Sequence, residues 1–171
     1  VLKFGSCLST LQLEQAWSTA LRLNEEKYWF ALGNKALEVM NIGLAIRVYR
    51  ELGDPGMVLS LSFLEHVENK QLLSGHIQIL FGNIDKAQEY FLASSDPSEA
   101  LNLRRDLMDW DQAIRLASSL DPSSVPSVSI QYAHQLESKA DYPNALRNYE
   151  NALNVLSESK REETPKDAFL E

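Results

Sequence analysis

The sequence predicts an all-α fold, a solenoid of antiparallel helical hairpins with about ten helices in its 171 residues. One observation is a recurring phrase, in which an apolar or aromatic residue is followed three positions later by Ala and, four positions further, by another apolar or aromatic residue. A second is that Gly and Pro are few, 7 and 6, and most of them fall at or near the ends of segments with helical period. No alternating strand pattern competes with that period. A repeated helical phrase is typical of stacked hairpins, which usually bind proteins.

The recurring phrase is clear at three places and looser at two others. The clear copies are Ile42–Tyr49, Ile84–Phe91 and Tyr142–Tyr149, and the looser ones are Leu13–Ala20 and Trp110–Ala117. The alanines lie at positions 16, 45, 87, 113 and 145, which are separated by 29, 42, 26 and 32 residues. The uneven spacing favours an irregular solenoid, and the gap of 42 leaves room for a longer unit around residues 53–67.

Start and stop signals place the individual helices between short connections. Asp before Pro, as at Asp96 and Asp121, fits a helix start, and the segment Gly53–Gly56 breaks a helix. The expected helices are 10–22, 26–40, 42–52, 55–67, 69–81, 84–94, 97–107, 110–120, 125–139 and 142–157. We expect one helical segment over residues 1–157 and a charged, flexible tail or linker over 158–171. Because the first residue is Val, we interpret the chain as a fragment of a longer one.

The phrase matches the tetratricopeptide (TPR) pattern, in which small residues let two helices approach and large ones fill the space around them. The best copy has Trp29, Leu32 and Gly33 on the first helix and Ala45 and Tyr49 on the second. Ala36 replaces the usual Tyr. The other residues assigned to repeat packing are Gly75, Ala87, Phe91, Ala113, Tyr132, Ala133, Ala145 and Tyr149. The predicted class is therefore a TPR-like α-solenoid.

Composition excludes several functions. The net charge of −8 argues against nucleic acid or an anionic membrane as the main ligand. A single cysteine rules out an internal disulfide framework. No segment reaches the roughly 20 apolar residues needed to cross a bilayer, so we expect no direct membrane insertion.

No catalytic, cofactor or metal site is expected. His66 lies between Glu65 and Glu68, but a solvated helix face explains these residues better than a metal site does. Cys7 has no nearby His that would activate it as a nucleophile. Asp109 and Asp111 flank Trp110 at a helix start, where carboxylates favour the helix dipole.

Partner contact is the remaining candidate role for individual side chains. Tyr28, Trp29 and Phe30 are consecutive on a helix, so they cannot all face one core, and one should reach a neighbouring helix or a partner. Arg104 and Arg105 could pair with Asp106 or Asp109, or with an acidic partner. The candidate partner-contact residues are Trp17, Tyr28, Phe30, Arg104 and Arg105.

Longer runs in the sequence resemble a known family. The runs are LQLEQAWSTALRLNEEKYWFALGNKALEVMNIGLAIRVYRELGD, AQEYFLASS, ALNLRRDLMDWDQAIRLA and QYAHQLESKADYPNAL. Together they cover roughly residues 11–153 and are similar to the helical region of the WD-repeat and TPR subunits of the intraflagellar transport A complex. In that family two β-propellers precede a TPR-like solenoid, and this chain contains no propeller blade.

The resemblance implies a non-catalytic scaffold with no cofactor. It implies contacts with other subunits of the complex and with ciliary cargo adaptors, at the ciliary base, along the axoneme and in the cytoplasm. Its implied roles are retrograde transport and membrane-protein trafficking. Two alternatives remain open: a freestanding TPR adaptor that binds an extended peptide, and a subunit of a coatomer-like vesicle coat.

Overall fold

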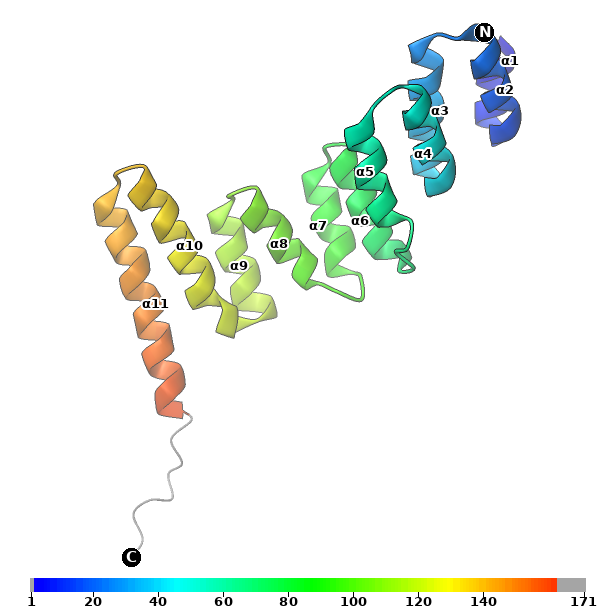
Figure 1. Ribbon diagram of the computed structural model, residues 1–171. Helices are drawn as coiled ribbons and strands as arrows, with labels where there is room; N and C mark the ends of the chain where they lie inside the picture. The colour runs from blue at the N-terminus through cyan, green and yellow to red at the C-terminus, as the bar shows by residue number, and fades with distance from the viewer. Residues whose placement is uncertain (1, 163–171) are drawn as a thin grey trace, which may run out of the picture. The chain divides into compact units, whose positions relative to one another are not determined.

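The computed structural model describes the backbone of residues 2–162 and the side chains of residues 3–157, and this part is entirely helical and turn (Figure 1). The helices are α1 (Leu2–Ser9), α2 (Leu13–Leu23), α3 (Glu26–Glu38), α4 (Ile42–Glu51), α5 (Pro55–Leu64), α6 (Lys70–Leu80), α7 (Ile84–Leu92), α8 (Ser98–Asp106), α9 (Trp110–Leu120), the 3₁₀-helix η1 (Pro122–Ser124), α10 (Val125–Ser138) and α11 (Tyr142–Glu162). They form two compact units, Val1–Ser95 and Asp96–Glu171. Most consecutive helices pack as hairpins within each unit, so the predicted all-α, TPR-like solenoid class is confirmed.

The ten predicted helices correspond to α2–α11, and two elements were not predicted. Helix α1 is only eight residues long and contains Gly5 and two serines, which weaken the helical signal of its sequence. The core stabilises it, because Phe4 packs edge-on against Tyr28 of α3 with ring centroids 5.0 Å apart. The short η1 follows Asp121, whose carboxylate accepts from the backbone N–H of Ser123.

The C-terminal helix is longer than expected. Helix α11 continues to Glu162, five residues beyond the predicted end at 157. The rest of the predicted tail, residues 163–171, lies outside the described residues. The division of the chain into a segment 1–157 and a tail stays a prediction.

One turn geometry recurs between helices. Six connections have three residues, and the middle residue of each has a positive φ: Leu11 (56°), Met40 (58°), Gly53 (70°), Gly82 (76°), Met108 (57°) and Ala140 (61°). The third residue of each turn donates its backbone N–H to the carbonyl five residues earlier, at 2.8–3.0 Å. This is the Schellman arrangement, which satisfies the last carbonyls of the preceding helix. Its recurrence keeps the paired helices antiparallel.

Small residues let the paired helices approach closely. A Cβ added at Gly33 would lie 3.2 Å from Cε2 of Tyr49, and one added at Gly75 would lie 2.5 Å from Cδ1 of Phe91. Both pairs are sixteen residues apart, as are Ala133 and Tyr149. In the hairpins α1–α2 and α8–α9 the large residue is on the first helix and the small one on the second: the equivalent buried pairs are Phe4 with Ala20 and Leu101 with Ala117. Each of these five hairpins therefore places one small residue at this contact, on its first helix in some and on its second in others.

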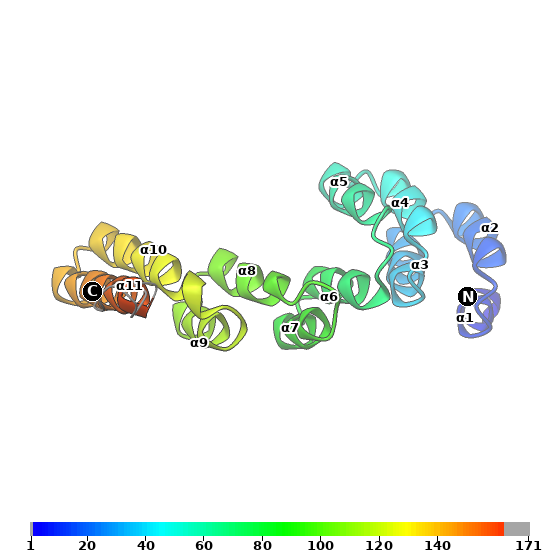
Figure 2. The same cartoon turned by 90° about the horizontal axis from the view of Figure 1, so that it is seen from below.

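Helix α5 accounts for the 42-residue gap between Ala45 and Ala87. It follows α4 through the same three-residue turn, but its position equivalent to the repeat alanine is Val58. Helices α6 and α7 then form the next hairpin with its own alanine, Ala87. Helix α5 is thus an additional helix between two repeat hairpins, and it lies beside α4 in both views of Figures 1 and 2.

Candidate protein-binding surface at helices α4 and α5

Helix α5 is apolar around most of its circumference, with the sequence PGMVLSLSFL. Asp54 starts it, because its Oδ1 accepts from the N–H of Met57 at 2.9 Å and Pro55 occupies the first turn. Leu61 and Leu64 are buried and join the core formed with α3, α4 and α6. A surface helix normally pairs one apolar stripe with a polar face, so the largely apolar sequence indicates that α5 offers a second face for packing.

That second face is exposed. The side chains of Leu59 and Phe63 are 60% and 73% exposed, and they lie one helical turn apart. With Pro55, Val58 and Ser62 they form a continuous stripe at helical spacing, which we call the α5 stripe. Phe63 is one of the most exposed large apolar side chains among those described. Contiguous exposed apolar side chains of this kind mark interaction sites.

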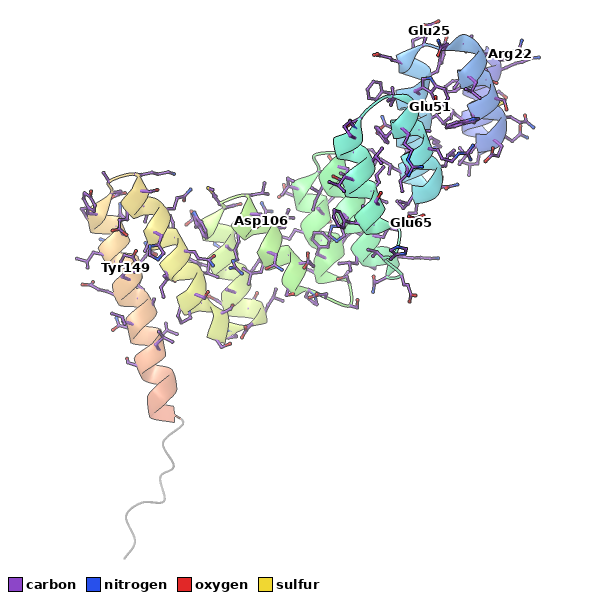
Figure 3. All side chains as sticks on the ribbon, viewed as in Figure 1. Arg22, Glu25, Glu51, Glu65, Asp106 and Tyr149 are labelled. Carbon is purple, nitrogen blue, oxygen red and sulfur yellow. The ribbon has the colours of Figure 1, made fainter. Side chains whose placement is uncertain are left out.

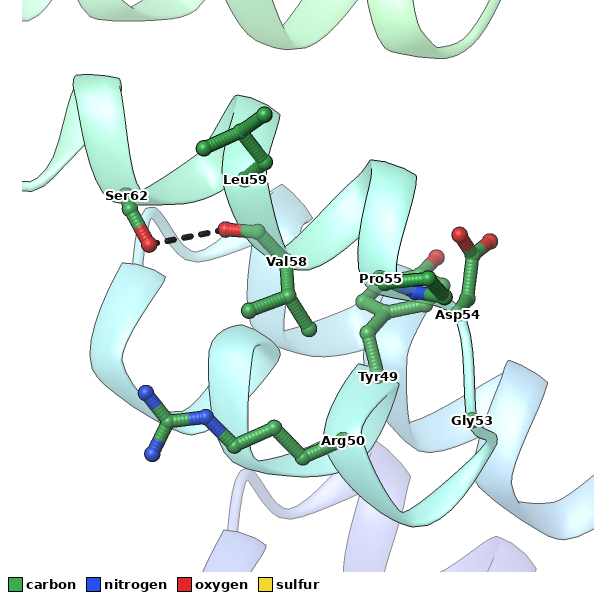
Figure 4. Close-up of a pocket in the computed structure, with 8 residues that line it drawn as sticks. All are labelled: Tyr49, Arg50, Gly53, Asp54, Pro55, Val58, Leu59 and Ser62. Atoms are coloured by element: carbon green, nitrogen blue, oxygen red, sulfur yellow. Dashed lines mark hydrogen bonds between the residues drawn. The ribbon is translucent and has the colours of Figure 1, made fainter.

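A pocket of about 610 Å³ lies between the α5 stripe and α4 (Figure 4). It is lined by Tyr49 and Arg50 of α4, by Gly53 and Asp54 of the turn, and by Pro55, Val58, Leu59 and Ser62 of α5. The Ser62 hydroxyl donates to the Val58 carbonyl at 2.8 Å, so it adds little unsatisfied polarity. The pocket therefore suits an apolar side chain.

Two charged side chains, Arg50 and Asp54, border the pocket, and they differ in whether they already have a partner. The Arg50 guanidinium makes no hydrogen bond or ion pair with any described residue, whereas one carboxylate oxygen of Asp54 accepts from the α5 N-terminus. In Figure 4 the Arg50 side chain extends away from Asp54. Burial, and then the nearby negative charge of Asp54, raise the pKa of the Tyr49 hydroxyl above its usual value near 10, so this ring stays neutral at physiological pH. One unpaired positive charge thus borders an apolar pocket.

The candidate partner-contact residues of the first unit have different environments. Tyr28 is buried against Phe4, so α1 is the neighbouring helix that its ring reaches. Trp17 is half-buried, with Trp29 edge-on to its ring at 4.8 Å and the Arg47 guanidinium over its face at 4.5 Å. Phe30 is 48% exposed, so part of its side chain lies at the surface. Partner contact by these residues stays a prediction.

The two candidate arginines of the second unit have intramolecular partners. Arg104 is buried, and its Nη1 lies 3.0 Å from Oδ2 of Asp109, one of the two carboxylates suggested by the sequence. Arg105 is half-buried, and its Nε donates to Oε1 of Gln131 at 2.9 Å. Arg104 thus contacts the turn before α9 and Arg105 contacts α10, which leaves less of either side chain available to an acidic partner.

Most of the residues assigned to repeat packing are buried. Trp29, Leu32, Gly33, Ala45, Tyr49, Gly75, Ala87, Phe91, Ala113, Ala133 and Ala145 all lie in the helix interfaces. Tyr132 is half-buried and stacks on Trp110 at 5.7 Å. Tyr149, on α11 (Figure 3), is also half-buried, and its hydroxyl donates to Oε2 of Glu137 at 3.0 Å and lies 2.9 Å from Nδ1 of His134.

Sequence reasoning did not identify the α5 stripe or Arg50. The only signal in the sequence is the apolar segment 55–64, which the spacing of the repeat alanines assigns to a longer unit without indicating which side chains are exposed. Among the described residues there is no group of three or more His, Cys, Asp or Glu side chains that could hold a metal ion. No helix of the described part is long and apolar enough to cross a membrane.

Comparisons with known proteins show that the chain is similar to WD repeat-containing proteins and, more weakly, to an intraflagellar transport protein. It is 42% identical over 142 residues to WD repeat-containing protein 19 of Homo sapiens, and the aligned region covers 83% of this chain and 11% of that protein. It is 38% identical over 138 residues to WD repeat-containing protein dyf-2 of Caenorhabditis elegans, covering 81% of this chain and 10% of that protein. A weaker match, 24% identical over 105 residues, is the intraflagellar transport protein 80 homolog of Rattus norvegicus, covering 59% of this chain and 14% of that protein.

No protein-family model matches the chain. The chain spans about a tenth of the length of the two WD-repeat relatives. The identity to them extends over most of the chain, far beyond the generic repeat alanines. The resemblance that the sequence predicted is thereby confirmed: the chain is homologous to a helical segment of WD repeat-containing protein 19.

Proposed function

We propose that the chain is a non-catalytic scaffold segment of an intraflagellar transport A subunit. The observation that supports this most directly is the identity of about 40% to WD repeat-containing protein 19 over four fifths of the chain. The helical hairpins supply surface for protein contacts rather than an enclosed catalytic site. The proposed partners are other subunits of the complex and ciliary cargo adaptors, and the proposed location is the ciliary base, the axoneme and the cytoplasm.

The proposed cellular role is retrograde transport together with membrane-protein trafficking in cilia. A stack of hairpins suits such a role because each hairpin contacts only its neighbours, which leaves its outer faces for partners. The many buried alanines and the exposed α5 stripe agree with this division between packing and contact.

The test is entry of the full-length protein into the transport complex. A tagged full-length protein is expected to co-purify from ciliated cells with the other subunits, and its loss should stop cargo from returning from the ciliary tip. A protein carrying Gly75→Trp, which would force the α6–α7 hairpin apart, should lose complex entry, whereas Gly43→Ala, at a position with open space, should keep it. Failure of the wild-type protein to enter any transport complex would refute the proposal.

The alternatives predict other results. A freestanding TPR adaptor would bind an extended peptide without the complex, and a coatomer-like subunit would co-purify with vesicle coats. The uneven positions of the repeat alanines and the extra helix α5 disfavour the regular concave array that peptide-binding TPR domains use.

A further inference from the structure

The α5 stripe and its pocket form a surface with a definite chemistry. Leu59 and Phe63 are exposed one turn apart, the pocket beside them is lined mainly by Tyr49, Val58 and Leu59, and the unpaired Arg50 borders it. We propose that this surface binds an amphipathic helix of a partner protein, which inserts an apolar side chain into the pocket and places a carboxylate against Arg50. This inference rests on the proposed scaffold function and names the surface that performs it.

The apolar geometry fits a helix. Residues at i, i+3, i+4 and i+7 form one side of a helix, and Pro55, Val58, Leu59 and Ser62 have this spacing. Packing a second helix beside α5 would cover Leu59 and Phe63 and would give α5 the two-sided packing that its largely apolar sequence suits. A pocket of about 610 Å³ accommodates a Leu, Ile or Phe side chain of the partner.

The charges around the pocket favour a partner with a negatively charged side chain at this position. The chain is acidic overall, with a net charge of −8, but at this apolar surface Arg50 has no ion-pair partner among the described residues. Asp54 accepts from the N–H of Met57 at the α5 N-terminus and forms no ion pair with Arg50. The guanidinium can hold a carboxylate through two parallel hydrogen bonds, so an acidic residue at the edge of the partner helix is the complementary group.

The test uses the full-length protein in ciliated cells, with Phe63 replaced by the photoreactive residue p-benzoylphenylalanine. Leu21 on α2, which is 51% exposed, gives a matched control position in the same unit. After irradiation, the crosslinked peptides are identified by mass spectrometry. We expect Phe63 to crosslink one segment of another protein, with apolar residues at i and i+4 and an acidic residue beside them, several-fold more strongly than Leu21 does.

A charge reversal then tests the Arg50 contact. Arg50→Glu should lower the crosslink yield by about tenfold, because it sets like charges together. Changing the acidic residue of the partner to Lys should restore the yield. Arg22→Glu on α2 makes the same charge change on an exposed arginine away from the stripe and should have no effect. Since Arg50 is exposed, the fold should survive, and Arg50→Gln with an unchanged circular dichroism spectrum is the milder second variant.

Several results would overturn the proposal. Crosslinks to a second copy of the protein, to another segment of the same polypeptide or to lipid would assign the stripe a different occupant. A yield at Phe63 no higher than at Leu21, or equal effects of Arg50→Glu and Arg22→Glu, would remove the evidence for a specific surface. Complex entry without the Phe63 crosslink would leave the scaffold function and refute this surface. The Phe63 crosslink without complex entry would support this surface and refute the scaffold function.

Discussion

The ring of Phe91 on α7 occupies the space that a Cβ at Gly75 on α6 would need. Phe91 is almost completely buried, so the ring cannot easily move aside. The same relationship joins Gly33 and Tyr49 one hairpin earlier, but there the added Cβ would lie 3.2 Å from Cε2 of Tyr49, compared with 2.5 Å from Cδ1 of Phe91. The contact between α6 and α7 is therefore the tighter of the two.

Gly75→Ala should destabilise the protein although Ala is the better helix former. Overpacking a close contact costs about 1–3 kcal/mol, against a gain of up to about 1 kcal/mol in helix propensity. We expect a net loss in the free energy of unfolding, measured by urea denaturation. Gly43→Ala is the control, because nothing lies within 4 Å of an added Cβ there, and it should stabilise α4. Equal stability changes at the two glycines would show that the contact with Phe91 is unimportant.

The N-terminus of α5 should depend on the oxygen of Asp54 rather than on its charge. Asp54→Ala removes the acceptor for the N–H of Met57 and should cost about 1 kcal/mol. Asp54→Asn keeps an acceptor and should cost much less. Glu51→Ala, which removes the same charge from an exposed position of α4, should change the free energy of unfolding by less than about 0.5 kcal/mol. An Asp54→Asn variant as unstable as Asp54→Ala would mean that charge matters more than capping.

The packing positions were predictable from the sequence, and the exposed surface was not. Gly33, Ala45 and Tyr49 recur as a phrase because close helix contact restricts side-chain size at each of them. Which face of an apolar helix stays uncovered depends on the helices around it, so the sequence of α5 did not reveal that Phe63 is exposed. Helix α1 was missed for a related reason, since its sequence has weak helix propensity while its Phe4 packs against Tyr28 of α3, a contact that the sequence does not show.

Tyr49 should make stability fall at high pH. Burial, and next the charge of Asp54, raise its pKa in the folded protein above the unfolded value near 10. The folded state therefore favours the neutral phenol: its contribution is complete below pH 10 or so and is lost as the pH rises through the folded pKa. Urea denaturation at pH 8 and pH 11 should show a smaller loss for Tyr49→Phe than for wild type. Identical pH dependence in both would refute the assignment.

In the second unit, the pair of Arg104 and Asp109 joins the last turn of α8 to the residue before α9. Arg104 is buried and hydrogen-bonded to a carboxylate, so Arg104→Ala should cost about 1–3 kcal/mol in the free energy of unfolding. Arg115→Ala, at an exposed position of α9, is the control and should cost under about 0.5 kcal/mol. A double-mutant cycle with Asp109→Ala isolates the pair from other contacts of Arg104. Because Arg104 is largely shielded from solvent, the coupling should persist at high ionic strength, whereas a coupling abolished by salt would indicate a solvent-exposed pair.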